Sequence, residues 1–324
     1  MQRRSTEVLP AAEKRWGLWL LVVVVSLLAS PAFAQSRSKK GHRVGVGMDR
    51  RTNEAVEQAL SYLAERQNPI DGSWEDRVGR KVYTTYRGRI APHVGVTALC
   101  GVAFLSNGVV PGGGPPGRFW KNGKLIDSKS YRNATGRRVT GSEIVNKALD
   151  FVISQTSATG YIRAHGSRMY SHAFASLFLA EAYGMGYTRG GKLRAALRRS
   201  IAMIEGAQNV EGGWRYRPQA QDSDMSITVC QVIALRAARN SGISVGKKTI
   251  DKAVQYVQQS FLPSVGAFTY QLGPEFRNVP SRHSFALTAA GVTTLYGAGV
   301  YSDSDMIRRA VAYMWQDRPP PSKA

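Results

Sequence analysis

The sequence predicts an all-α fold built from repeated helical hairpins. Four turns with a glycine and an aromatic residue recur roughly fifty residues apart, except where a long loop intervenes. An amphipathic helix precedes each turn, and a helix that is apolar nearly all round follows it. Such a period is typical of stacked hairpins, and the contrast between the two helices indicates an outer and an inner ring. The repeat positions are Gln67, Trp74, Gln155, Tyr161, Gln208, Trp214 and Phe268.

The first 34 residues have the features of a signal peptide. Arg3, Arg4, Lys14 and Arg15 precede an apolar run, and Ala32-Phe33-Ala34 forms a small-x-small cleavage site. We therefore expect residues 1–34 to direct export to the periplasm or cell exterior, with a retained membrane anchor as the alternative. Residues 35–51, basic and rich in glycine, are expected to form a linker.

The charge of the chain favours anionic partners. The net charge is +22, and residues 1–34 contribute four Lys or Arg and two Asp or Glu, which leaves +20 after cleavage. Such a charge favours phosphorylated glycans, acidic lipid head groups, nucleic acid or an acidic ligand, although an arginine-rich composition with solvated helix faces explains it equally well. We find no motif for nucleic-acid binding, no P-loop and no paired-cysteine metal motif.

Four hairpins can be followed in order along the chain. The first helix begins near residues 52, 142 and 249 in the first, second and fourth units, and in the third unit it carries Leu193, Leu197, Ile201 and Ile204. The second helix of the four units begins near residues 93, 172, 226 and 283. Residues 108–141, rich in proline, glycine and basic residues, are expected to form the longest loop. Cys100 and Cys230 both lie in apolar helical runs, so we expect two buried thiols and no disulfide.

A fifth outer helix is expected near the C-terminus. Ile307, Val311 and Tyr313 follow helical spacing, but residues 317–324 read DRPPPSKA where a turn and an inner helix would come next. We therefore expect an open arc with an exposed apolar edge, followed by a Pro-rich tail over 317–324.

The turn sequences also resemble those of a known superfamily. QNPIDGSW (67–74) and QNVEGGWRY (208–216) are similar to the Gln-Trp repeat of squalene and terpene cyclases. Residues 52–316 resemble the prenyltransferase/squalene-oxidase repeat superfamily as a whole. The resemblance implies an α/α toroid, here incomplete at its C-terminal end, whose inner helices frame a central cavity. It implies no particular activity, because one fold hosts unrelated functions.

The resemblance offers two catalytic sets, and both match only in part. The zinc ligands of protein prenyltransferases are an Asp-x-Cys pair and a later His, which correspond here to Asp224, Ser226 and His283. A serine hydroxyl is a poor zinc ligand, so we predict no metal and no other cofactor. The Asp-x-Asp-Asp acid motif of class II terpene cyclases corresponds to Asp222-Ser223-Asp224-Met225, which lacks one carboxylate.

The start of the inner helices is the candidate working surface. We expect His93, His172, Ser226 and His283 to share one register there, with Asp224 beside them. Helix N-termini attract anions, and the preceding loops add arginines to the end of the toroid where the inner helices begin. The loop arginines are Arg89, Arg168, Arg215, Arg217 and Arg282. The alternative is that each histidine only bonds to its preceding loop.

These residues lead to three function hypotheses. The first is an exported binding or scaffold module for an anionic or prenyl ligand, held by His93, His172, Arg215, Arg217 and Arg282 above an apolar cavity. The expected cavity lining is Val96, Leu99, Phe174, Leu177, Ile227 and Phe285. The second is a divergent prenyl-lipid enzyme with Asp224 and His283 as catalytic residues. The third is a peripheral envelope protein held by charge on an anionic surface. The sequence gives no prediction of an oligomeric state.

Overall fold

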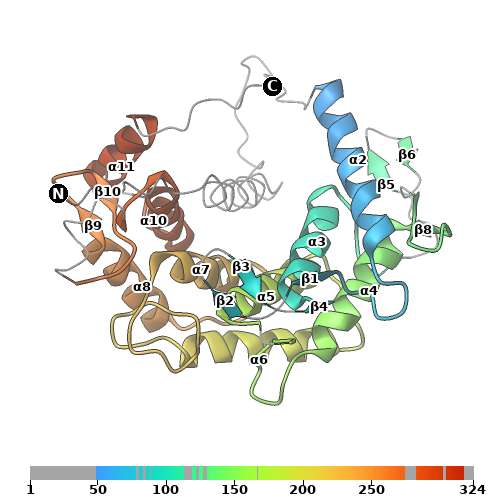
Figure 1. Ribbon diagram of the computed structural model, residues 1–324, viewed down its shortest axis with the longest axis horizontal. Helices are drawn as coiled ribbons and strands as arrows, with labels where there is room; N and C mark the ends of the chain where they lie inside the picture. Colours follow the sequence, from blue (N-terminus) through green and yellow to red (C-terminus); the bar gives the residue numbers. More distant parts are fainter. Residues whose placement is uncertain are drawn as a thin grey trace, which may run out of the picture.

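The computed structural model describes residues 49–77, 80–82, 85–87, 89–112, 119–121, 124–126, 130–165, 167–273, 282–301 and 304–316. Helices dominate these residues and form two concentric rows that curve into an open arc (Figure 1). The predicted all-α, toroid-like fold is therefore confirmed. The expected signal peptide (1–34), most of the linker (35–51) and the Pro-rich tail (317–324) lie outside the described residues. Within the described part of the chain, every helix is too short or too polar to cross a bilayer.

Inner and outer helices alternate along the chain. The outer row consists of α2 (Arg50–Arg66), α4 (Gly141–Ser154), α6 (Lys192–Gly206), α8 (Lys247–Gln259) and α11 (Ser304–Gln316). The inner row consists of α3 (Val94–Ser106), α5 (Met169–Gly184), α7 (Met225–Asn240) and α10 (Phe285–Ala298). Each inner helix packs on the next, α3 on α5, α5 on α7 and α7 on α10. This continuous packing explains why the inner helices are buried and apolar on most sides.

A glycine in each turn locks one hairpin against the next. Gly160 has φ +85°, and a Cβ placed there would lie 2.1 Å from the carbonyl oxygen of Arg199 in the following outer helix. Gly212 repeats this arrangement with φ +89° and the carbonyl oxygen of Lys252 at 2.4 Å. Only glycine supplies both the positive φ and the close approach. Gly72 and Gly266 occupy the same position in the first and last hairpins.

The residue two positions after this glycine enters the core. Trp74, Trp214 and Phe268 are buried there, as the sequence predicts. In the second hairpin the position belongs to Ile162, which is fully buried, whereas Tyr161 is only half-buried. In this hairpin the core position is therefore held by Ile162, the residue after the repeat position Tyr161. The residue two positions after the turn glycine is buried in every hairpin, whether or not its side chain is aromatic.

The glutamine before the turn joins successive hairpins. The Gln67 amide donates to the carbonyls of Gly72 and Ile144, at 3.0 and 2.9 Å. The Gln208 amide donates in the same way to Gly212 and Thr249, at 2.8 Å each. Gln155 departs from the pattern and donates to Ser154 instead. The repeat glutamine thus connects its own turn to the next outer helix in the first and third hairpins.

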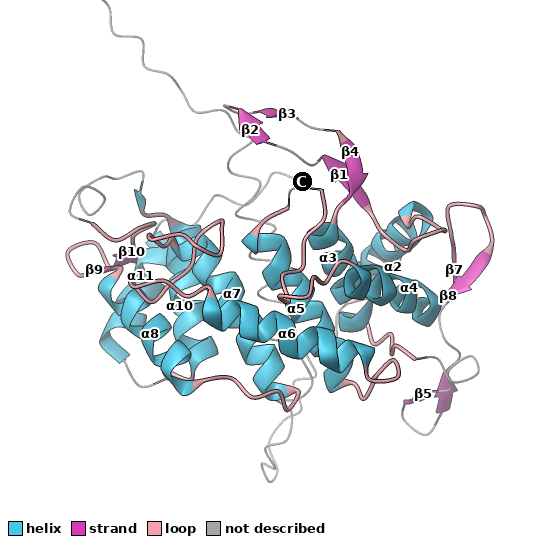
Figure 2. Ribbon diagram, turned by 90° about the horizontal axis from the view of Figure 1, so that it is seen from below, coloured by secondary structure: helices cyan, strands magenta, loops and turns pink. Residues whose placement is uncertain are grey.

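Short antiparallel strand pairs lie in the loops between the helices. They are β1 (Glu75–Arg77) with β4 (Ile90–Pro92), β2 (Arg80–Val82) with β3 (Thr85–Arg87), β5 (Phe119–Lys121) with β6 (Lys124–Ile126), β7 (Ser130–Arg132) with β8 (Arg138–Thr140), and β9 (Phe261–Leu262) with β10 (Ala267–Phe268). The β1–β4 ribbon leads directly into α3 and projects from the face of the helical body where α3 begins (Figure 2). Residues 108–141, expected to form the longest loop, contain the β5–β6 and β7–β8 strand pairs.

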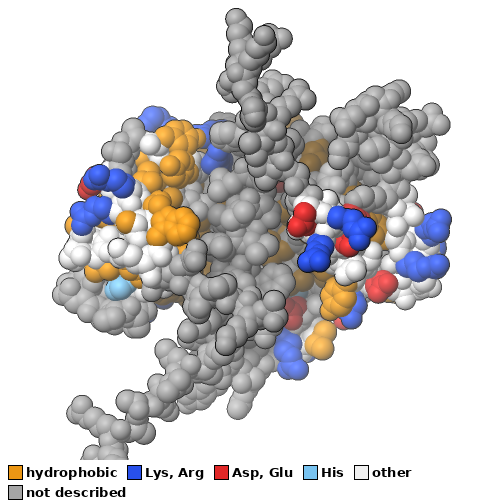
Figure 3. Space-filling view, turned by 90° about the horizontal axis from the view of Figure 1, so that it is seen from above, with side chains coloured by type: hydrophobic (Ala, Val, Ile, Leu, Met, Phe, Trp, Pro, Cys, Tyr) orange, Lys and Arg blue, Asp and Glu red, His pale blue; other side chains and the backbone are white. Residues whose placement is uncertain are grey.

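The C-terminal end of the arc exposes apolar side chains. Trp315 is 69% exposed, and Val311 lies one turn earlier on the same face of α11. Tyr296 and Tyr301, whose ring centroids lie 5.5 Å apart, are also exposed, and Figure 3 shows apolar atoms gathered over this end of the molecule. The predicted exposed edge is confirmed. Cys100 and Cys230 are buried free thiols, as expected.

Candidate functional site

The inner helices begin at equivalent positions, but the histidines do not share them. The backbone N–H groups of Trp74 and Trp214 donate to the Thr97 and Thr228 hydroxyls, at 2.9 and 3.2 Å. Four residues before each threonine lies the helix N-cap, which is His93 in α3 and Asp224 in α7. Counting from the same contact, the caps of α5 and α10 are Arg168 and Ser284.

The expected common register of the three histidines is therefore wrong. His172 lies four residues inside α5, where its Nδ1 accepts the N–H of Ile162 at 3.1 Å and replaces the threonine hydroxyl. His283 lies one residue before the cap of α10, and its Nδ1 is 3.2 Å from the Tyr313 hydroxyl. The loops before these helices differ in length, so a histidine near a helix start does not mark one level.

Each histidine has a local partner. His93 caps α3 by accepting the N–H of Val96 at 3.2 Å, and burial lowers its pKa. Burial lowers the pKa of His172 to about 4, so its ring is neutral near pH 7. Its Nε2 is buried without a hydrogen-bond partner. Of the three histidines, His172 therefore bonds to the loop before its helix, whereas His93 bonds within α3 and His283 contacts α11.

Asp224 is a fully buried carboxyl group with several donors. Its Oδ1 accepts the Ser226 hydroxyl at 2.6 Å and the N–H of Ile227 at 2.8 Å. Its Oδ2 accepts the Tyr270 hydroxyl at 3.3 Å. Burial raises the pKa of Asp224, although the Ser226, Ile227, Arg215 and Tyr270 contacts oppose that shift. A buried carboxyl with a shifted pKa is a candidate functional group.

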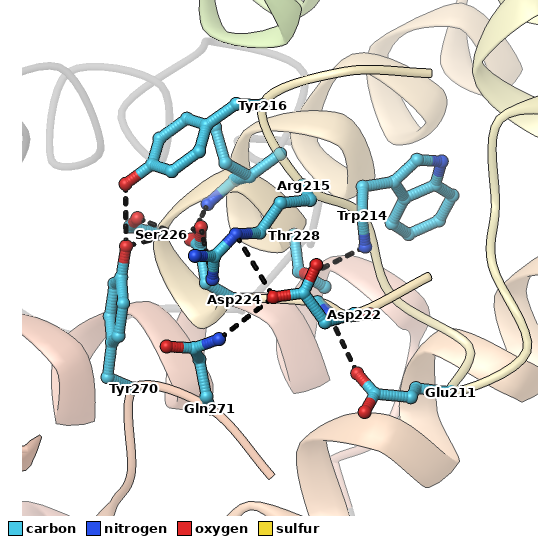
Figure 4. Close-up of polar contacts among 12 residues, drawn as sticks. Glu211, Trp214, Arg215, Tyr216, Asp222, Asp224, Ser226, Thr228, Tyr270 and Gln271 are labelled. Carbon is cyan, nitrogen blue, oxygen red and sulfur yellow. Dashed lines mark hydrogen bonds and ion pairs between the residues drawn. The ribbon is translucent and has the colours of Figure 1, made fainter. Parts of the chain in front are cut away.

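Tyrosines from three segments lie around this carboxyl, and Figure 4 shows two of them, Tyr216 and Tyr270. The Tyr170 hydroxyl of α5 lies 2.5 Å from the Ser226 hydroxyl, and the Tyr216 and Tyr270 hydroxyls lie 2.7 Å apart. Burial raises the pKa of Tyr170 and of Tyr270, so both phenols hold their protons. We call Tyr170, Tyr216, Asp224, Ser226 and Tyr270 the tyrosine–aspartate cluster.

Arg215 borders the cluster and is shared between two carboxylates. Its Nε lies 3.4 Å from Asp222 Oδ2, and its Nη1 lies 3.7 Å from Asp224 Oδ2. The guanidinium also lies 5.0 Å from the Tyr216 ring centroid and 6.0 Å from that of Tyr270. Its Nη1 is buried and makes no hydrogen bond. One donor of this cation is therefore unsatisfied beside the cluster.

An open pocket of about 420 Å³ adjoins Arg215. We call it the basic pocket, and it is lined by Arg168, Arg215, Tyr216, Arg217, Gln219 and Ala220. It contains the predicted ligand residues Arg215 and Arg217. Arg282 lies near the cluster instead, with its guanidinium 6.0 Å from the Tyr270 ring centroid. Arg89 lies elsewhere and contacts His165.

The other predicted site residues are only partly brought together. His283 contacts α11, while Asp224 belongs to the cluster, so the two suggested catalytic residues have different partners. Of the expected cavity lining, Leu177 and Ile227 are fully buried in the core, and the remaining four keep partial exposure. The described residues contain no group of three His, Cys, Asp or Glu side chains placed to hold a metal ion.

Sequence reasoning missed the tyrosines. Tyr216 and Tyr270 each follow a turn aromatic by two residues, and Tyr170 follows the cap of α5 by two residues. Their common offsets within the repeat were the available signal. Reading the offsets of all residues in each hairpin would have placed Tyr216 and Tyr270 on adjacent loops.

Solved structures with a similar shape support the fold. No protein-family model and no curated protein sequence matches the chain. A variant of the type II terpene cyclase MstE from Scytonema, in complex with geranylgeranyl dihydroxybenzoate as substrate, superposes with a TM-score of 0.52 and 15% identity over 93% of this chain and 69% of that chain. The apo form of MstE superposes with a TM-score of 0.51 and 15% sequence identity, and the match covers 93% of this chain and 70% of that chain. The chain thus has the fold of terpenoid cyclases, as the turn sequences indicate.

Proposed function

We propose that the chain binds a ligand with an anionic head and an isoprenoid-like apolar body, with the head in the basic pocket. The observation that carries this proposal is the clustering of Arg168, Arg215 and Arg217 around one open volume. Guanidinium groups recognise phosphate and carboxylate groups through paired donors. The prenylated substrate held by the similarly folded cyclase supports an apolar body.

In this proposal the apolar body of the ligand lies along the inner helices. Val96 and Leu99 of α3, Phe174 of α5 and Phe285 of α10 are apolar yet partly exposed. Ligand sites commonly combine such apolar walls with a few polar groups that fix orientation. In this proposal the cluster and the basic pocket provide the polar end.

Calorimetry with three ligands tests the proposal. We expect geranylgeranyl diphosphate to bind more tightly than inorganic diphosphate, which lacks the apolar body. We also expect it to bind more tightly than neutral geranylgeraniol, which lacks the anionic head. Arg217→Gln should weaken diphosphate binding about tenfold, as expected for one lost charge-assisted contact. Arg239→Gln, at the exposed end of α7, is the matched control. Equal affinity of both variants for diphosphate would contradict the proposal.

A second candidate function is acid-catalysed conversion of an isoprenoid by Asp224. The buried position and raised pKa of this carboxyl favour it. Against it, Arg215 lies close enough to stabilise the ionised form, and Met225 is buried where the cyclase motif has a further carboxylate. Incubation with squalene and geranylgeranyl diphosphate, followed by product analysis of wild type and Asp224→Asn, decides between binding and turnover. Products formed by wild type and lost in the variant would establish the enzyme.

Export is the proposed location, with the charge as a means of retention. The support comes from the sequence of residues 1–34 and from the charge of +22. Cell fractionation checks export, and release from envelopes by salt checks whether charge holds the protein there, because salt screens such contacts. Recovery from the cytoplasm with residues 1–34 intact would contradict the location.

A further inference from the structure

We propose that anion binding in the basic pocket is coupled to protonation of Asp224, with Arg215 as the shared group. The proposal rests on the proposed function, because it requires an anion in that pocket. It adds that the site takes up a proton together with its ligand. It therefore assigns Asp224 a role in binding that does not depend on any catalytic step.

Arg215 has the geometry of a group that can change partners. Its separations from Asp222 and Asp224, 3.4 and 3.7 Å, exceed the 2.7–2.9 Å that is typical of a strong charge-assisted hydrogen bond. Its Nη1 makes no hydrogen bond, and the side chain also lines the basic pocket. In this proposal an anion in the basic pocket competes with both carboxylates for the guanidinium.

Such an anion changes the electrostatics at Asp224. Arg215 is one of the groups that favour the ionised carboxyl, so its neutralisation by a bound anion removes part of that support. Burial, which favours the neutral carboxyl, is unchanged. Asp224 therefore binds a proton more readily in the complex. By linkage, the protein takes up protons on binding, and the anion binds more tightly at lower pH.

The other groups around Asp224 do not provide this coupling. Several titratable and charged groups act on Asp224 or on its partners. They are Tyr170 from the neighbouring inner helix α5, Cys230 from α7 itself, Tyr256 from α8, Tyr216, Tyr270 and Arg282 from the loops, and the carboxylates Glu211 and Asp222. Burial raises the pKa of Tyr170, Tyr256, Tyr270 and Cys230, which keeps them protonated. Asp222, which pairs with Arg215 directly, is the carboxylate that needs a control variant.

Sulfate is the probe, because its charge stays constant over the pH range of the experiment. Calorimetry between about pH 4 and pH 7, in two buffers of different ionisation enthalpy, gives the affinity and the number of protons exchanged. We expect wild type to take up a fraction of a proton. Its affinity should fall as pH rises, about tenfold for each unit by which sulfate raises the pKa of Asp224.

Two asparagine variants separate the carboxylates. Asp224→Asn keeps a good helix cap and should bind sulfate without proton uptake. Asp222→Asn should keep the uptake and bind more tightly, because one competitor for Arg215 is gone. An infrared difference spectrum of wild type supplies a readout that needs no variant, namely a gain in protonated carboxyl on addition of sulfate.

The outcomes distinguish the two proposals. Sulfate binding without proton uptake, or equal uptake in wild type and Asp224→Asn, would overturn the coupling and leave the basic pocket standing. Failure of wild type to bind sulfate would overturn the pocket and the coupling together. Loss of uptake in Asp222→Asn alone would assign the proton to Asp222 and overturn the role of Asp224.

Discussion

The starts of α3 and α7 have the same scaffold and different chemistry. In both, a tryptophan N–H donates to a threonine hydroxyl, and the indole N–H donates to a carbonyl of the preceding outer helix. In both, the cap side chain accepts the N–H three residues later. Yet the cap of α3 is the half-buried His93, while the cap of α7 is the fully buried Asp224.

The difference lies in what the neighbouring hairpins contribute. Tyr170 reaches Asp224 from the preceding hairpin through Ser226, and Tyr270 reaches it from the following one. His93 belongs to the first hairpin and is preceded by the β1–β4 ribbon. The repeat thus fixes where a cap lies, and a site appears where the hairpins on both sides add polar groups. The predictions below test the shared scaffold first and the differing chemistry afterwards.

The turn glycines should give the largest effects, and equal ones in both regions. Gly72→Ala and Gly212→Ala each force an alanine into positive φ and into the carbonyl of the next outer helix, at 2.5 and 2.4 Å. We expect each to lower the free energy of unfolding by about 3 kcal/mol or more. Gly242→Ala is the matched control, because it has φ +86° and no atom within 4 Å of the added Cβ. Urea titrations measure the three variants, and a control as unstable as Gly212→Ala would refute the role of the close contact.

Replacing the threonines that accept the tryptophan N–H should have a smaller effect on stability, again of equal size in the two regions. Thr97→Val and Thr228→Val keep the shape of the side chain but leave a buried N–H unpaired. We expect each to lower the free energy of unfolding by about 2 kcal/mol. Thr293→Val, in a partly exposed position of α10, is the comparison. A difference of several-fold between Thr97 and Thr228 would show that the two scaffolds are not equivalent.

These contacts show which parts of the fold and of the site can be predicted from the sequence. Turn glycines, the buried tryptophans and the inner and outer rows follow from short-range patterns, so they are predictable. The common register of the histidines was wrong because the loops between the turns and the inner helices differ in length. His93 is the cap of α3, but His172 lies inside α5 and His283 lies before the cap of α10. The tyrosine–aspartate cluster was missed because Tyr170, Tyr216 and Tyr270 come from separate segments. Only packing of successive hairpins brings them to Asp224.

Removing the cap side chains should have a smaller effect that begins to distinguish the regions. His93→Ala removes one hydrogen bond to a helix N–H and should cost about 1 kcal/mol of stability. Asp224→Ala removes the same contact and also leaves the Ser226 and Tyr270 hydroxyls without this acceptor, so we expect about 2 kcal/mol. Thermal unfolding measures both. Equal losses would mean that the cluster adds nothing to the stability of the cap.

The smallest effect should be the pH dependence of stability, and its sign should be opposite in the two regions. Burial raises the pKa of Asp224, so the stability it contributes is present at low pH and is lost as pH rises above about 4 toward the folded-state pKa. Burial lowers the pKa of His93, so its contribution is present above about pH 6.5 and is lost as pH falls toward the folded-state pKa.

The same replacement at both caps isolates these two titrations. Asparagine is a good cap and does not titrate, so Asp224→Asn and His93→Asn keep the helix start and remove the ionisable group. Relative to wild type, Asp224→Asn should gain stability as pH rises from about 4 to 7, because the wild-type carboxyl is held in an environment that disfavours its charge. His93→Asn should gain relative to wild type as pH falls over the same range, because only the unfolded wild type binds a proton on the histidine easily. Urea unfolding at several pH values measures both differences, and curves for the two variants that run parallel would contradict the assignment of opposite environments to two equivalent caps.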